Sequence, residues 1–447
     1  MKSLKAPVAI VGGGLAGSEA AYQLARRGIP VRLYEMRPNR LTPAHKTGHL
    51  AELVCSNSLG ADLLTSPAGI LKAELRRMGS LIMRCADENR VPAGKALAVD
   101  RERFAISVSE ALASCPLVEI VREEVKEMPE GLAIIATGPL TSGSMSEALR
   151  RLIGRDFLYF FDAVSPIVTA ESIDFDVVFK ASRYGEGEDY LNCPMDEVEY
   201  QRFWEALSSA ERAPLHSFER DERYFEGCLP IEVMAKRGRD VMRYGPMRPV
   251  GLVDPKSGKT PYAVVQLRRE DAEGTLYSLV GFQTNLKWSE QERVFRMIPG
   301  LQRAEFVRFG VMHRNVYVNA PLILNEDLSL RARRDIYLAG QIVGVEGYME
   351  STAMGLVTAL SAYSAILGLP LPRWPKETAI GSLLCYIINA RADNFQPMNV
   401  NLGIFPPLGA KVRDRRKRCE AVARRALTAL EQFMAEYSII FDEVVIN

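Results

Sequence analysis

The sequence predicts an α/β fold built on a parallel sheet, with a mixed α+β domain inserted into it. Three stretches predict the sheet, because each is a short apolar run followed within two residues by glycine: Val8–Val11, Leu132–Ala136 and Ile336–Ala339. Short apolar runs of this kind are typical of buried parallel strands. Between the second and third runs the sequence changes to alternating strands and short helices. We therefore expect one domain from residues 1–180 and 311–447 and an inserted domain at 181–310.

The first run leads into a glycine-rich turn that is typical of dinucleotide binding. Gly12, Gly14 and Gly17 have the G-x-G-x-x-G spacing, a helical stretch follows, and a second strand ends at Glu35. The first glycine permits the tight turn, the second lets a pyrophosphate approach the backbone, and the third lets helix and strand pack closely. An acid about 20 residues further on commonly binds a ribose hydroxyl. The residues predicted to bind such a cofactor are Gly12, Gly13, Gly14, Leu15, Ala16, Gly17, Glu35, Gly138, Gly340 and Gln341.

A second helix of small residues favours FAD over NAD as the bound dinucleotide. Ser351–Leu367 follows the third strand, and its N-terminus could point back at the first glycine turn. The positive end of a helix dipole there would stabilise a reduced, anionic flavin ring. Two elements at opposite ends of the chain would then serve one cofactor.

The composition indicates a soluble globular protein in a reducing compartment. The chain is 47% hydrophobic and 25% charged, with a net charge of +1, and it has no apolar run of the ~18 residues that span a membrane. Seven cysteines occur singly without a C-x-x-C, which argues against a disulfide framework or a zinc site and for the cytoplasm. We expect no metal, no membrane association and no obligate protein partner.

The C-terminal stretch Lys411–Tyr437 reads as one basic helix. Its cations form either an ordinary solvated helix face or a patch that binds the RNA backbone, since lysine and arginine bind phosphate without reading sequence. The residues that would make the patch are Arg413, Arg415, Arg416 and Arg418.

Several motifs together resemble a known family, the folate- and FAD-dependent tRNA (uracil-5-)-methyltransferases of bacteria. The similarity runs over nearly the whole chain and rests on VGGGLAGSEAA, EMRP, AELVCSNSL, YFEGCLPIE, VGFQTNLKW, RVFRMIPGLQRAEFVRFGVMHRN and LAGQIVGVEGYMESTAMG. IPGLQRAE and the AGQI motif are also similar to the glucose-inhibited division protein A family, whose members modify the tRNA wobble uridine. CSNS and FEGCLPIE separate the two families, and this chain has both.

The resemblance implies a Rossmann-type FAD-binding domain of the glutathione-reductase and GidA kind, and a particular reaction. Members transfer the methylene carbon of methylenetetrahydrofolate to C5 of a T-loop uridine in tRNA and reduce it to methyl. FAD serves as carrier and reductant, and NAD(P)H supplies the electrons. The chemistry needs a thiolate that adds to uracil C6 and a base that removes the C5 proton.

Two cysteines and two ring side chains are the candidates for these roles. By the resemblance, Cys228 in FEGCLPIE is expected to be the C6 nucleophile, and Cys55 in CSNS to act near the flavin as the C5 base; which thiol has which role stays open. Either thiol needs a neighbour that favours the thiolate, because a free thiol titrates at about 8.5; Arg220 and Arg223 are near Cys228 in sequence. His313, or else Tyr348, is expected to face the folate pterin. The other cysteines are interpreted as structural: Cys85, Cys115, Cys193, Cys385 and Cys419.

Three alternatives remain at this point. A plain FAD-dependent oxidoreductase of a small substrate would need a second nucleotide unit or a redox C-x-x-C, and the sequence has neither. A wobble-uridine enzyme would have a longer C-terminal helical domain. A non-enzymatic RNA-binding flavoprotein would keep its tRNA binding after loss of both Cys55 and Cys228.

Overall fold

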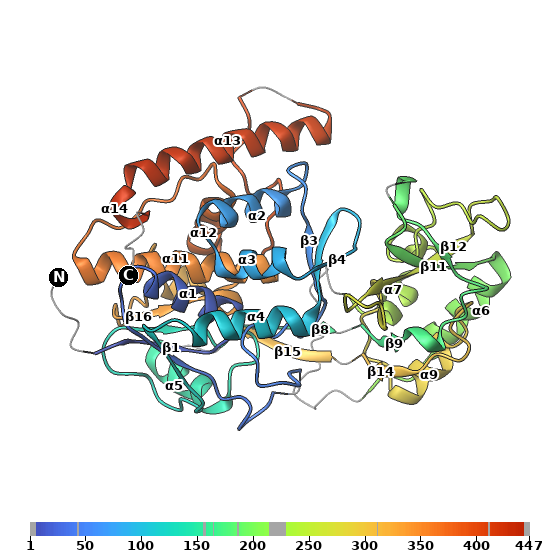
Figure 1. Cartoon of the computed structure of the whole chain (residues 1–447), viewed down its shortest axis with the longest axis horizontal. Helices are drawn as coiled ribbons and strands as arrows, with labels where there is room; N and C mark the ends of the chain where they lie inside the picture. Colours follow the sequence, from blue (N-terminus) through green and yellow to red (C-terminus); the bar gives the residue numbers. More distant parts are fainter. Residues whose placement is uncertain are drawn as a thin grey trace.

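A computed structural model describes residues 6–42, 44–154, 158–163, 165–185, 187–213, 229–310, 312–409 and 412–441, with the backbone alone for 158–163 and 312–314. The described chain forms two bodies, each built on its own sheet (Figure 1). Among the described residues, no helix is both long and apolar enough to cross a membrane, and no cluster of three metal-binding side chains is found.

The larger body is built on a five-stranded parallel sheet. Its strand order is β16-β7-β1-β2-β6, with the bounds Ile336–Leu338, Ala133–Ile135, Val8–Val11, Val31–Tyr34 and Val118–Val121. All four strand pairs are parallel, as the sequence predicts. The sequence also predicts short strands near Val118–Val121 and Val125–Met128. The first is confirmed as β6, but the second prediction is wrong, because Val125–Met128 forms no strand and pairs with none.

Helices cover both faces of this sheet, and a small second sheet flanks it. In Figure 1, α1 and α11 lie on the opposite side of β1 from α5. The helices are α1 (Leu15–Ala25), α2 (Pro67–Arg77), α3 (Leu81–Glu88), α4 (Arg101–Ala113), α5 (Gly143–Ile153), α10 (Ala320–Ile323), α11 (Tyr348–Leu367), α12 (Ala379–Asn389), α13 (Arg415–Glu436) and α14 (Ser438–Phe441). The small antiparallel sheet has the order β3-β5-β4, with the bounds Ser58–Ala61, Ala96–Val99 and Arg90–Val91.

The smaller body is an antiparallel sheet with helices packed on it. Its strand order is β10-β11-β12-β13-β9-β14, with the bounds Phe179–Lys180, Tyr190–Met195, Ala263–Arg269, Leu276–Leu279, Ile167–Thr169 and Phe306–Arg308. The helices are α6 (Glu197–Ser209), α7 (Ile231–Arg237), α8 (Val241–Tyr244) and α9 (Trp288–Phe295). An apolar core separate from that of the parallel sheet lies between them. β8 (Leu158–Ala163) and β15 (Met312–Tyr317) pair as an antiparallel ladder. In sequence, these two strands stand just before and just after the strands of the smaller body.

The predicted domain boundaries differ in part from this arrangement. β9 and β10 belong to the antiparallel sheet although both precede residue 181. β9 pairs with both β13 and β14, so the edge strand β14 is joined to the rest of the sheet through β9. The division of the chain at 181 and 310 therefore stays a prediction, and the sheet itself begins at Ile167.

Glycine lets α1 approach its neighbours at backbone distance. A Cβ at Gly17 would lie 1.8 Å from the carbonyl oxygen of Gly12, and one at Gly355 would lie 2.3 Å from the carbonyl oxygen of Ala16. Both contacts are with main chain, so no side chain can move aside. The first strand, α1 and α11 thus form one tightly packed unit.

This packing predicts that Gly355→Ala destabilises the fold. The added methyl group must push α11 away from α1, which costs about 1–3 kcal/mol as overpacking does elsewhere. Thermal unfolding followed by circular dichroism should show a lower midpoint. The matched control is Gly143→Ala in α5, where a Cβ would meet no atom within 4 Å. An equal midpoint for Gly355→Ala and the control would contradict the packing argument.

Candidate functional site

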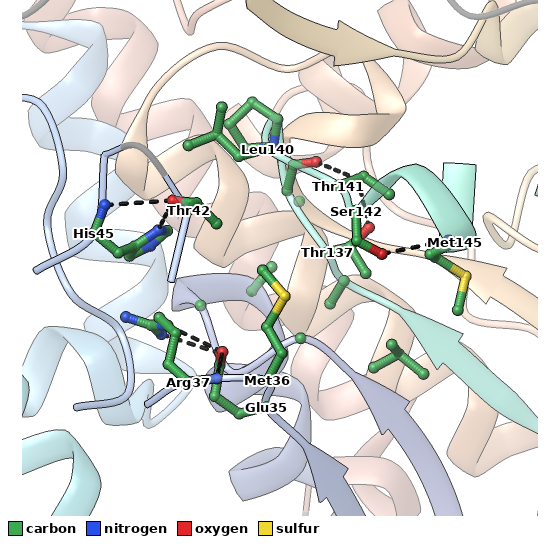
Figure 2. Close-up of a pocket in the computed structure, with 18 of the residues that line it drawn as sticks. Glu35, Met36, Arg37, Thr42, His45, Thr137, Leu140, Thr141, Ser142 and Met145 are labelled. Carbon is green, nitrogen blue, oxygen red and sulfur yellow. Dashed lines mark hydrogen bonds and ion pairs between the residues drawn. The ribbon is translucent and has the colours of Figure 1, made fainter. Parts of the chain in front are cut away.

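A pocket lies at the carboxyl ends of the parallel strands, where open α/β sheets bind ligands. Its walls come from the segments after β1, β2, β7 and β16 and from the start of α11 (Figure 2). Of the residues predicted to bind a dinucleotide, the pocket is lined by Gly12, Gly14, Leu15, Ala16, Glu35, Gly138, Gly340 and Gln341. Residues predicted from the two ends of the chain, such as Gly12 and Gly340, therefore line the same pocket.

The glycine turn presents bare backbone to this pocket. Gly12 has a φ of +106°, which favours glycine, and its N–H donates to the carbonyl of Tyr34 at 2.8 Å. Gly14 is the N-cap of α1 and makes no side-chain cap, and a Cβ built on it would meet no atom within 4 Å. Open space therefore adjoins the unpaired N–H groups of the first turn of α1, as an anion site needs. Gly17, by contrast, lies under the turn and serves packing.

Glu35 follows β2 as predicted, but its carboxylate is already fully bonded. It accepts hydrogen bonds from the Gly13 N–H and the Arg37 N–H, and from Nε and Nη2 of Arg37, each at 3.0 Å. Burial would raise the pKa of Glu35, but the hydrogen bonds and charge of Arg37 outweigh it and hold that pKa below its usual range. Four donors fill the acceptor positions of a carboxylate. A ribose hydroxyl would therefore share an oxygen with Arg37 or displace one of these donors.

Arg37, Thr42 and His45 are site residues that sequence reasoning did not assign, although the irregular loop after Glu35 is expected where ligands bind in such a sheet. Arg37 is buried and also pairs with Glu52 at 3.0 Å. Beyond it, the Oγ1 of Thr42 and the Nδ1 of His45 lie 2.6 Å apart at the rim of the pocket (Figure 2). The EMRP motif and the irregular loop were the available signals, but neither indicates where an arginine side chain points.

The far end of the pocket is formed by the start of α11. Tyr348, the first residue of this helix, and Ser351 in its first turn line the cavity, as do Gly340 and Gln341. The predicted second helix N-terminus therefore does face the site of the first. It starts at Tyr348 rather than Ser351 because Gly347, with a φ of +119°, caps it.

Cys55 lies beside this end of the pocket. Its backbone N–H donates to the hydroxyl oxygen of Tyr348 at 2.8 Å, and that of Ser56 donates to the same oxygen at 3.2 Å. Cys55 is partly exposed, and its neighbour Val54 lines the pocket. The structure thus brings together Cys55 and Tyr348, two residues that were predicted separately.

Other predicted residues are placed elsewhere or lie outside the described residues. Cys228, Arg220 and Arg223 lie outside them, and for His313 the structure gives only its place in β15, opposite Asp162. Of the remaining cysteines, Cys85, Cys193 and Cys419 are buried and Cys115 and Cys385 are partly exposed.

The basic tail forms a helix that starts later than expected. α13 begins at Arg415, not Lys411, because the side chain of Asp414 caps it by accepting from the Lys417 N–H. The four predicted RNA-binding arginines, all exposed, are Arg413, Arg415, Arg416 and Arg418. α13 lies along the outside of the larger body, with this end toward the antiparallel sheet (Figure 1).

Comparisons with known proteins agree with this architecture. The family described as "Glucose inhibited division protein A" matches residues 7–370. A solved structure of Aquifex aeolicus GidA superposes with a TM-score of 0.70 at 15% identity, over 97% of this chain and 75% of that chain, which shows a shared fold.

Curated relatives match over almost their whole length. The protein "Methylenetetrahydrofolate--tRNA-(uracil-5-)-methyltransferase TrmFO" of Desulforudis audaxviator is 61% identical, over 96% of this chain and 98% of the relative. The protein of the same name from Heliobacterium modesticaldum is 58% identical, over 97% of this chain and 99% of the relative. The chain therefore belongs to the glucose-inhibited division protein A family and, within it, to the TrmFO methylenetetrahydrofolate–tRNA-(uracil-5-)-methyltransferases.

Proposed function

We propose that this protein transfers the methylene carbon of methylenetetrahydrofolate to C5 of a T-loop uridine in tRNA and reduces it to methyl. The observation that carries this proposal is identity above 50% with relatives of that name over nearly their full lengths. NAD(P)H supplies the hydride equivalent that the change from methylene to methyl requires. The products are then 5-methyluridine, tetrahydrofolate and NAD(P)⁺.

The pocket has the features that FAD requires. The open space at Gly14 and the first turn of α1 suit a pyrophosphate, and Gly340, Gln341 and the start of α11 suit the flavin ring. Glu35 would take a ribose hydroxyl by sharing an oxygen with Arg37 or by displacing one of its present donors. When bound there, FAD would carry the one-carbon unit and the reducing electrons.

The side chains near the flavin end would then act on uracil and folate. Cys55 is next to that end and is proposed as the base for the C5 proton, and Cys228 as the C6 nucleophile. Tyr348 and His313 are proposed to contact folate. Burial raises the pKa of Tyr348, so its phenol stays neutral and accepts the two N–H groups of the Cys55 loop.

The first test is transfer of label from folate to RNA. Purified protein is mixed with unmodified tRNA transcript, methylenetetrahydrofolate labelled in its methylene carbon, and NAD(P)H. We expect label in 5-methyluridine for the wild type and for the control Cys115→Ala. Loss of the base in Cys55→Ala should lower the rate by about 10²-fold or more, and Cys228→Ala should abolish it.

The outcome also separates the alternatives. No label from a yellow protein that oxidises NAD(P)H would refute the methyltransferase and favour a plain oxidoreductase. Label in 5-methyluridine from Cys228→Ala would leave the reaction standing and move the nucleophile to another residue.

The glycine turn gives a separate test of the cofactor site. Gly14 has an ordinary negative φ and free space around it, so Gly14→Val should fold. Its side chain would occupy the place proposed for the pyrophosphate, and we expect loss of flavin absorbance with an unchanged unfolding midpoint of the cofactor-free protein. Full flavin content in Gly14→Val would place the dinucleotide elsewhere; Gly143→Ala is again the control.

The exposed arginines at the start of α13 predict an electrostatic contribution to tRNA binding. Replacing Arg415, Arg416 and Arg418 together by glutamine should weaken binding and reduce the slope of log affinity against log salt by about one per lost phosphate contact. The control replaces Arg150 and Arg151 of α5, which pair with Glu147 and Glu127 respectively. Equal affinities and slopes for the two variants would mean that the tail arginines form only a solvated face.

A further inference from the structure

Two arginines that are distant in the sequence donate hydrogen bonds to the backbone carbonyls of residues 53–55, the segment that carries Cys55. Arg101, the first residue of α4, donates to the carbonyl oxygens of Leu53 and, at 3.5 Å, of Cys55. Arg308, at the end of β14, donates to the carbonyl of Val54 at 2.5 Å. Consecutive carbonyls therefore turn toward guanidinium groups.

A third arginine holds the next residues from the antiparallel sheet. Arg268 of β12 donates to Oδ1 of Asn57 at 2.8 Å and to Oγ of Ser56 at 2.7 Å. The Asn57 amide in turn donates to the carbonyl of Arg269 at 2.8 Å. With Tyr348 on the amide side, contacts hold the Cys55 segment from several directions, and Cys55 itself is partly exposed.

The charges around this segment do not balance. Among the described residues, Glu270 is the carboxylate that pairs with this group: it lies 2.7 Å from Arg101 and 4.0 Å from Arg268, and its Oε1 accepts no hydrogen bond. Arg308 makes no ion pair among these residues. Three largely buried cations thus share one anion, and the excess positive charge favours a further anion nearby.

Two basic groups beside this segment have lowered pKa values. Burial lowers the pKa of Arg308, and the charge of Arg101 lowers it further, while charges on Tyr348, Cys55 and Glu270 oppose the shift. Burial likewise lowers the pKa of Lys46, and Arg308 and Arg101 lower it further. Neighbouring cations thus add to the effect of burial on these two groups. For Arg101, burial lowers the pKa, but the charges of Glu270 and Tyr348 outweigh it and the pKa is raised.

The charged and titratable groups that face Cys55 come from several elements. Arg101 of α4, Arg268 of β12, Arg308 of β14 and Tyr348 of α11 interact with it electrostatically. Glu270 pairs with Arg101 beside them, and Lys46 and Glu52 lie on the loop before Cys55. The Glu52 carboxylate instead forms an ion pair with Arg37 and accepts hydrogen bonds from the backbone N–H groups of Lys46 and Thr47. Tyr348 is neutral, and Arg101, Arg268 and Arg308 each interact electrostatically with Cys55.

We propose that Arg101, Arg268 and Arg308 are positioning residues that hold Cys55 as a thiolate in the resting protein. The inference rests on the proposed function for its role: an anionic Cys55 can take the C5 proton of the uracil. The S–H bond then forms, the C5–H bond breaks, and its electron pair stays with the pyrimidine ring. Cations within about 4–6 Å lower a pKa by about 1–3 units, which is enough to ionise a thiol at neutral pH.

The test measures the thiol directly, in the full chain without tRNA or folate. Iodoacetamide alkylates the thiolate, so the rate of modification of the Cys55 peptide, followed by mass spectrometry against pH, gives its titration midpoint. We expect a wild-type midpoint at least one unit below the ordinary ~8.5. The Cys115 peptide in the same samples is the internal reference.

Arg308 variants separate charge from structure. Arg308→Gln keeps an N–H donor for the Val54 carbonyl but removes the charge, so the midpoint should rise by about one unit. Arg308→Lys keeps the charge and should retain the low midpoint. Arg293→Gln, whose arginine is exposed and paired with Glu290, should have no effect.

The results decide the proposal independently of methyl transfer. A wild-type midpoint near 8.5, or no rise in a folded Arg308→Gln, would overturn it; if Arg308→Gln does not fold, the wild-type midpoint alone decides. A low midpoint in a protein that transfers no methyl group would keep the thiolate and refute the proposed function. Where transfer occurs, the acid limb of its pH–rate profile should move with the alkylation midpoint in Arg308→Gln.

Discussion

The structure depends on the contact of α1 with main chain on both sides. Gly17 lies against the carbonyl of Gly12, and Gly355 lies against the backbone of Ala16. These contacts fix the glycine turn, the first turn of α1 and the start of α11 relative to one another. The pocket is the space that remains in front of this unit, so its geometry follows from backbone packing rather than from the choice of lining side chains.

A second set of contacts joins the two sheets beside the pocket. Arg268 and Glu270 from the antiparallel sheet meet Asn57 and Arg101 from the larger body, at distances of 2.7–2.8 Å. Buried, charge-assisted hydrogen bonds are stronger than those on the surface. Because these contacts converge on residues 53–57, the place where the two bodies meet is also where Cys55 is held.

Much of the parallel sheet could be predicted from the sequence, because apolar runs and glycine spacing are local signals. The strands at Val8, Val31, Ala133 and Ile336 and the helix after Gly14 are examples. The limits were long-range: β9 joins the antiparallel sheet through partners more than a hundred residues away, and Val125–Met128 has strand composition but no neighbouring strand.

The site was predictable in the same sense. The glycine turn and Glu35 could be placed because their roles depend on spacing. The paired hydrogen bonds from Nε and Nη2 of Arg37 to Glu35 depend instead on a side-chain direction, which the sequence does not indicate. The cations around Cys55 come from positions 101, 268 and 308, whereas sequence reasoning considered thiol-activating arginines only near Cys228. No spacing rule connects residues that a fold brings together from three separate elements.

Tyr348 has a mechanical consequence for the order of events. One phenol oxygen accepts from the Cys55 and Ser56 N–H groups, while the same residue begins α11 and lines the pocket. The cysteine loop and the pocket end of α11 therefore cannot shift independently. A displacement of the start of α11 would therefore be transmitted to the backbone of residues 55 and 56, so the pocket end and the cysteine loop form one mechanical unit.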